Sequence, residues 1–148
     1  ARQDFQIFLT QFMAQARPAV QIGLYLDMAL ADYYLGDPAQ AEAAIQRALE
    51  FGQPVRRGLR LLTNRLLALM RPHPENEVLL RQALSLARDL QRRLDEAACL
   101  LSLSALVEDD AERSALWQTG ADILTQCGAA TWLTGRTPQN PPFIPMIY

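Results

Sequence analysis

The sequence predicts an all-α protein of seven to eight helices, arranged as antiparallel pairs that stack into an α-solenoid. Three observations lead to this prediction. Apolar residues recur at intervals of three and four along most of the chain, which is the period of an α-helix. Gly, Pro and Asp interrupt the pattern at short intervals, as they do at helix ends. Similar helix pairs then return after about 36 residues, which is typical of repeat proteins.

The stretch 22–54 is the clearest helix pair. Its first helix places Tyr25, Met28, Ala29 and Tyr33 on one face. Gly36 then ends this helix, Asp37 caps the next one, and Pro38 fits the first position of that next helix. The second helix repeats the helical spacing with Ala41, Ile45, Ala48 and Leu49. These signals predict two helices joined by a tight turn.

This stretch resembles a tetratricopeptide (TPR) repeat. In that family, helix A carries an aromatic residue, a Leu-Gly pair and a tyrosine, and helix B carries small residues around a larger apolar one. The matching positions here are Tyr25, Met28-Ala29, Tyr33 (one place from the tyrosine), Ala41, Ile45 and Ala48. The resemblance implies a concave groove that holds peptides and is lined by the first helix of each pair.

The other helices are expected from the same signals. We expect helices over residues 4–16, 19–35, 38–51, 54–70, 75–90, 95–107 and 111–127, and a short helical turn over 129–134. Pro18 and the run Pro72-His73-Pro74 separate neighbouring helices. The acidic run Glu108-Asp109-Asp110 favours the positive N-terminus of the helix that follows it.

An internal repeat supports stacking. The large helix-B residues align as Leu9, Ile45, Leu80 and Trp117, and the small or apolar ones as Phe12, Ala48, Ala83 and Gly120. The large residues are 36, 35 and 37 residues apart, close to the roughly 34 residues of the TPR family. We therefore expect Ile45, Leu80 and Trp117 to be buried at equivalent places. The array is divergent, because the position of Ala41 becomes Asn76 and Arg113 in the later pairs.

Charge is distributed unevenly along the chain. Residues 54–93 carry nine Arg and three acids, whereas both flanking regions are acidic, and the whole chain has a net charge of −2. Arg56, Arg57, Arg60 and Asn64 share one narrow arc of the helix 54–70. They form a candidate site for an acidic peptide or a C-terminal carboxylate, because guanidinium groups pair well with carboxylates. The more common alternative is a solvated face, or arginines paired with neighbouring acids.

The sequence contains no constellation that suggests catalysis, a metal site or a cofactor. His73 is the only histidine, and it has no evident partners for a triad or a zinc site. Cys99 and Cys127 fall in helical patterns, so we expect free, buried thiols and a reducing, cytoplasmic compartment. The near-neutral charge does not suggest direct binding to nucleic acid, and no apolar run approaches the length of a membrane helix. We predict that the protein is not an enzyme.

The two ends of the predicted repeat domain, residues 1–134, differ in character. Phe5, Phe8 and Phe12 make the first helix strongly apolar, and we expect them to support self-association as a two-fold dimer. The alternative is that this helix turns its Phe side onto helix 19–35 and the chain stays monomeric. Residues 135–148 form a Pro-rich apolar tail that we expect to pack on the chain's own last helices, or else on a neighbouring copy.

These features favour a non-catalytic protein–protein interaction module. The TPR resemblance and the helical texture suggest a scaffold or sensor region of a bacterial signalling or transcription regulator. The start at Ala1 without Met suggests a piece of a longer chain. Two alternatives stay open, namely a self-standing homodimeric adaptor or chaperone, and an accessory domain of an enzyme.

Overall fold

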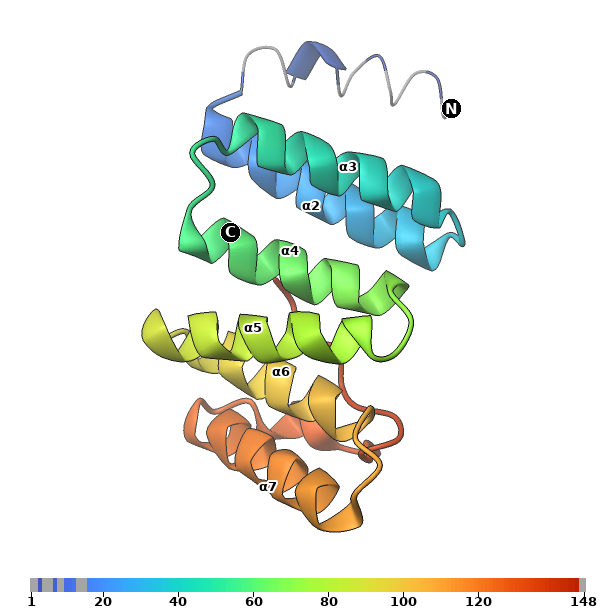
Figure 1. The fold of residues 1–148 in the computed structure, drawn as a ribbon. Coiled ribbons are helices and arrows are strands. Elements are labelled where there is room, and N and C mark those ends of the chain that lie inside the picture. The colour runs from blue at the N-terminus through green and yellow to red at the C-terminus, as the bar shows by residue number, and fades with distance from the viewer. Residues whose placement is uncertain (1–2, 4–6, 8–9, 13–15, 147–148) are drawn as a thin grey trace. The chain divides into compact units, whose positions relative to one another are not determined.

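The computed structural model describes residues 3, 7, 10–12 and 16–146, and within them the chain forms helices and loops without a β-strand. The α-helices are α2 (Pro18–Tyr34), α3 (Pro38–Phe51), α4 (Arg57–Met70), α5 (Glu75–Asp89), α6 (Arg93–Ser104) and α7 (Asp110–Gln126), followed by the 3-10 helix η1 (Ala130–Leu133). Helices α2 and α3 pack as one pair, and α4 to α7 pack on one another in sequence (Figure 1). The all-α class is confirmed, and the chain breaks between successive helices near residues 36, 52, 72, 92 and 109, as the predicted helix ranges require.

The chain divides into two compact units, one that ends at Arg56 and one that begins at Arg57. We call them the N-terminal unit and the C-terminal unit. The N-terminal unit contains the helix pair α2 and α3, and the C-terminal unit contains α4 to α7, η1 and the described residues after η1. This boundary lies inside the stretch 1–134 that we expected to form one repeat domain.

The turn between α2 and α3 follows the predicted chemistry. Gly36 has a φ of 80°, in the left-handed region that a residue without a Cβ atom enters at little cost. The Asp37 carboxylate accepts a hydrogen bond from the Gln40 N–H (3.1 Å), and Pro38 is the first residue of α3. The helix pair predicted over residues 22–54 is therefore present.

The buried face of α2 differs from the predicted one. Its buried residues include Ile22, Leu26 and Ala29, and the partner helix α3, which packs on α2, buries Ala41, Ala44, Ile45 and Ala48. Tyr25, Met28 and Tyr33 are only half-buried. The Tyr25 ring stacks on Phe51 with 5.6 Å between ring centroids. Tyrosine at the rim keeps its hydroxyl near water, which explains why the aromatic stripe borders the core instead of forming it.

Two predicted helix boundaries are wrong, for local reasons. The fourth helix was expected to begin at Pro54 but begins at Arg57. The side-chain amide of Gln53 donates to the Leu49 carbonyl (3.1 Å), so residues 52–55 form turns that close α3. The sixth helix was expected to reach Val107 but ends at Ser104, whose hydroxyl donates to the Leu101 carbonyl (2.6 Å).

The equivalent repeat positions are mostly buried. Ile45 and Leu80 are 1% and 5% exposed, as predicted. The small positions Ala48, Ala83 and Gly120 are buried as well. Trp117 is only half-buried, so the prediction for this residue is wrong. The physical reason is its place on α7, whose main packing partners among the described helices are α6 and η1.

The backbone at Gly120 approaches α6 closely, and this leads to a testable prediction. A Cβ atom at this position would lie 2.8 Å from Cγ of Leu101 and 3.3 Å from the Ala97 carbonyl oxygen. We expect Gly120→Ala to lower the free energy of unfolding by about 1–2 kcal/mol, because the overpacking outweighs the better helix propensity. Gly23→Ala in α2 is the matched control, since no atom lies within 4 Å there, and it should stabilise the chain by about 0.5–1 kcal/mol. Urea denaturation that gave both substitutions the same sign would contradict the close approach.

Candidate functional site

Helix α4 is buried on two sides, and this positions the candidate site. Leu59, Leu62 and Leu66 are buried on one side of the helix. Leu61 and Arg65 are also buried and belong to a second side of the helix. The second side faces a groove in the C-terminal unit that the residues after η1 partly occupy.

Arg65 is the central polar residue of this groove. Its side chain is 6% exposed. Nη1 donates to Oδ1 of Asp95 on α6 (2.5 Å), and Nη2 donates to the main-chain carbonyl of Ile144 (2.7 Å). Arg92 holds the second carboxylate oxygen of Asp95 at 2.7 Å. A buried guanidinium requires such partners, because an unpaired charge away from water is costly.

The C-terminal segment, which we define as residues 141–146, lies along this groove without helix or strand. In Figure 1 the segment, in red, runs back from η1 past α6 toward α4. Ile144 is 1% exposed and Pro142 is buried. A cavity of about 270 Å³ remains between the segment and the helices, lined among others by Arg65, Leu69, Leu80, Ser102, Leu106 and Phe143. The segment therefore covers an apolar groove without filling it.

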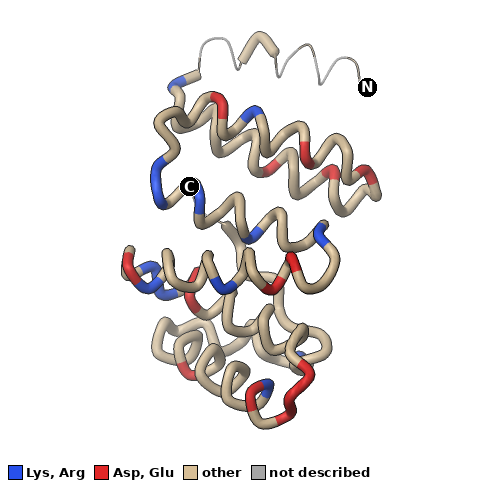
Figure 2. Tube along the Cα trace, viewed as in Figure 1, with Lys and Arg blue, Asp and Glu red and all other residues tan. Residues whose placement is uncertain are grey.

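A second buried acid follows Asp95 directly on α6. Glu96 is 8% exposed, accepts from Arg88 (3.1 Å), and accepts from Arg93 (2.8 Å). Each of the two buried carboxylates is thus paired with two arginines. The acids of α6 neutralise much of the predicted basic band, and Figure 2 shows arginines and acidic residues both present in this unit.

The two cysteines differ in environment. Cys99 is buried one turn after Asp95, and burial raises the pKa of its thiol to about 12, although the charge of Arg65 opposes this shift. Cys127 is a free thiol but exposed, which corrects the prediction that both would be buried. It follows the last residue of α7, where the chain turns toward η1 at the surface.

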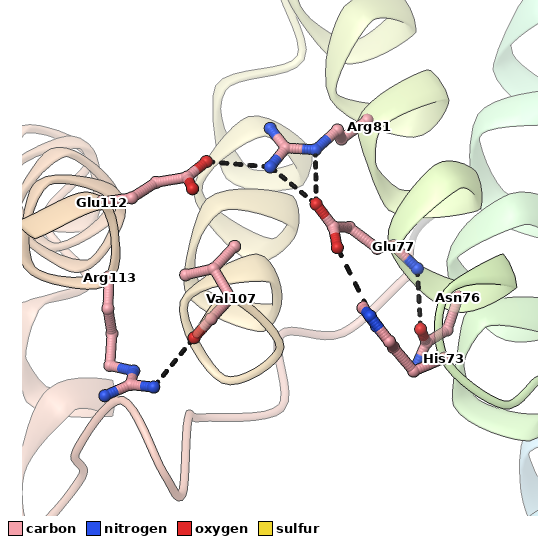
Figure 3. A network of polar contacts seen from close by, with 7 residues as sticks. All are labelled: His73, Asn76, Glu77, Arg81, Val107, Glu112 and Arg113. Carbon is pink, nitrogen blue, oxygen red and sulfur yellow. Dashed lines mark hydrogen bonds and ion pairs between the residues drawn. The ribbon is translucent and has the colours of Figure 1, made fainter. Parts of the chain in front are cut away.

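Figure 3 shows a polar network that joins α5 to α7. Arg81 donates to Glu77 (2.9 Å) and to Glu112 (2.8 Å), and the hydrogen bonds to Glu112 and Glu77 raise the pKa of Arg81 above its ordinary value. His73 lies 3.9 Å from Glu77, and Arg113 donates to the Val107 carbonyl (2.8 Å). The network holds neighbouring helices together, and its arginines already have partners.

The predicted arginine site is only partly assembled. Arg56, Arg57 and Arg60 are exposed, but Asn64 is 4% exposed and donates to the Gln82 side chain (3.3 Å). Arg57 forms an ion pair with Asp89, whose side chain is 55% exposed. Arg56 belongs to the N-terminal unit, whereas Arg57 and Arg60 belong to the C-terminal unit. Asn64 is therefore removed from the candidate site, and Arg57 fits the alternative of pairing with a neighbouring acid.

The predicted self-association site lies mostly outside the described residues. Phe5 and Phe8 lie outside the described residues, and Phe12 is 45% exposed. Within residues 3, 7, 10–12 and 16–146, no group of three or more His, Cys, Asp or Glu side chains is placed to hold a metal ion. None of the helices in that part of the chain has the length and apolar character that crossing a membrane requires.

Comparison of the chain with protein-family models, with curated proteins and with solved structures gives no match. The candidate site therefore depends on the geometry of this chain alone.

Sequence analysis missed the central residues of the groove, namely Arg65, Asp95 and Ile144. One signal was available, because Arg65 lies one helical turn after Leu61 and one turn before Leu69, on an apolar side of its helix. An arginine at such a position needs a buried acid. The sequence does not identify which of the sixteen acids supplies it.

Proposed function

We propose that this chain is a non-catalytic protein–protein interaction module, a TPR-like scaffold or sensor region of a bacterial signalling or transcription regulator. Consecutive helix pairs and buried small residues at equivalent repeat positions support this proposal. The observation that carries it is the groove of the C-terminal unit, where helices from two successive pairs hold a non-helical segment of protein. A cytoplasmic location is part of the proposal, since free thiols favour a reducing compartment.

Partner capture tests the proposal. The wild-type chain and the variant R56Q/R57Q/R60Q are used as bait at equal concentration, and the captured proteins are compared by quantitative mass spectrometry. The variant R17Q/R47Q/R136Q is the matched control, because it removes the same charge at other arginines. If the partner is acidic, we expect the first variant to recover at least fivefold less of it and the control to recover as much as wild type.

The captured partner is then purified and titrated against each variant at two salt concentrations. Loss of arginine contacts reduces both the affinity and its salt dependence. Equal affinity and equal salt dependence for all three chains would mean that the exposed arginines are solvated and do not contact the partner. Absence of any specifically captured protein would contradict the proposed function itself.

A further inference from the structure

The C-terminal segment is bound to the C-terminal unit as a peptide ligand would be. The Ile144 side chain is 1% exposed, and the carbonyl of the same residue accepts from Arg65 at 2.7 Å. Three prolines, Pro141, Pro142 and Pro145, flank this contact. Proline has no N–H group, so a proline-containing segment can enter an apolar groove without burying an unsatisfied donor.

Arg65 offers the groove one hydrogen-bond donor for a peptide carbonyl. Its charge is already balanced by Asp95 at 2.5 Å, and Arg92 holds the other oxygen of that carboxylate. The remaining donor, Nη2 of Arg65, meets a main-chain carbonyl in a groove that is otherwise lined mostly by apolar residues. The groove is therefore suited to a main-chain carbonyl next to an apolar side chain.

The fit of the C-terminal segment leaves space. A partly open cavity of about 270 Å³ lies beside it. Phe143 borders this cavity and is 39% exposed. A segment with larger or better placed apolar side chains would bury more surface in the same groove.

We propose that this groove is the binding surface for an extended, uncharged, proline-containing apolar segment of a partner protein, and that residues 141–146 occupy it as an internal competitor. The inference depends on the proposed function and names the chemistry of one partner segment. Release of the internal segment frees the Arg65 donor and the pocket of Ile144 together. Arg56, Arg57 and Arg60 do not take part in the binding of this apolar segment.

A peptide-binding measurement tests the proposal. A labelled peptide with the sequence of residues 138–148 is titrated into the full chain, into the released variant I144E, and into the control Q139E. Gln139 is exposed on the same tail, so the control adds the same charge without disturbing the groove. A tethered segment acts at an effective concentration of about millimolar. We therefore expect I144E to bind the peptide at least tenfold more tightly than wild type, and Q139E to match wild type.

A truncated chain and an altered peptide complete the test. If circular dichroism shows that I144E does not fold, a chain that stops after Pro138 replaces it. A peptide with the same Ile-to-Glu change should bind at least tenfold more weakly to the released chain. Equal binding of both peptides, or no binding to either released chain, overturns the proposal.

Light scattering tests whether the C-terminal segment of a second copy occupies the groove. A wild-type dimer that I144E converts to monomer would mean that the segment of a second copy fills the groove, which overturns the partner proposal. A captured partner whose affinity is the same for wild type, I144E and Q139E would also overturn it. That last result would leave the proposed interaction function intact, so the two failures are distinguishable.

Discussion

Replacing Asp95 by Ala lowers the free energy of unfolding by roughly 3–5 kcal/mol, the effect expected when one partner of a buried ion pair is removed. The side chains of Arg65 and Asp95 are 6% and 8% exposed, so the guanidinium left behind cannot be solvated well. Arg65→Met is expected to cost a similar amount, because it leaves the Asp95 carboxylate with Arg92 alone and the Ile144 carbonyl without its donor. Urea denaturation of each variant measures both effects.

The double variant Arg65→Met/Asp95→Leu distinguishes the net contribution of the ion pair from the cost of leaving one buried charge unpaired. With both charges gone, the loss should be smaller than the sum of the single losses, since no unpaired charge stays buried. Asp89→Ala is the matched control, because the pair Arg57–Asp89 has side chains 58% and 55% exposed and should contribute less than about 1 kcal/mol. Equal costs for Asp89→Ala and Asp95→Ala would show that burial does not distinguish the two pairs.

Truncation of the large repeat residues is the second large effect. Ile45→Ala in the N-terminal unit and Leu80→Ala in the C-terminal unit should each cost roughly 2–5 kcal/mol, because both remove methyl groups from a packed core. Trp117→Ala should cost less than a buried tryptophan would, since this residue is half-buried. Leu35→Ala is the control, because Leu35 is 78% exposed. Losses below about 1 kcal/mol at both Ile45 and Leu80 would mean that the repeat alignment is wrong.

Local signals account for the parts of the fold that could be predicted from the sequence. The turn at Gly36, Asp37 and Pro38 depends on φ, a side-chain oxygen and a missing N–H, all of which are properties of single residues. The same holds for Asp109, which accepts from the Glu112 N–H (2.7 Å) at the start of α7, as the acidic run predicts. Such chemistry needs no knowledge of distant contacts.

Contacts between distant residues account for the rest. Arg65 forms hydrogen bonds with Asp95, 30 positions away, and with Ile144, 79 positions away. Helix periodicity carries no information on such pairings. The predicted arc contained Arg56, Arg57, Arg60 and Asn64 and treated their helix as isolated. In the structure Asn64 donates a hydrogen bond to Gln82 of the neighbouring helix instead of facing solvent. The exposure of Cys127 likewise depends on where the chain turns after α7.

The groove also has a consequence for the order in which the chain leaves the ribosome. Ile144 follows Ser104, the last residue of α6, by 40 positions. Synthesis at about 5–20 residues per second takes roughly 2–8 s over this distance, whereas helices form within about a microsecond. Helices α4 to α6 therefore emerge with their apolar surface uncovered for seconds, a period in which a nascent-chain chaperone or the partner can reach it before the internal segment exists.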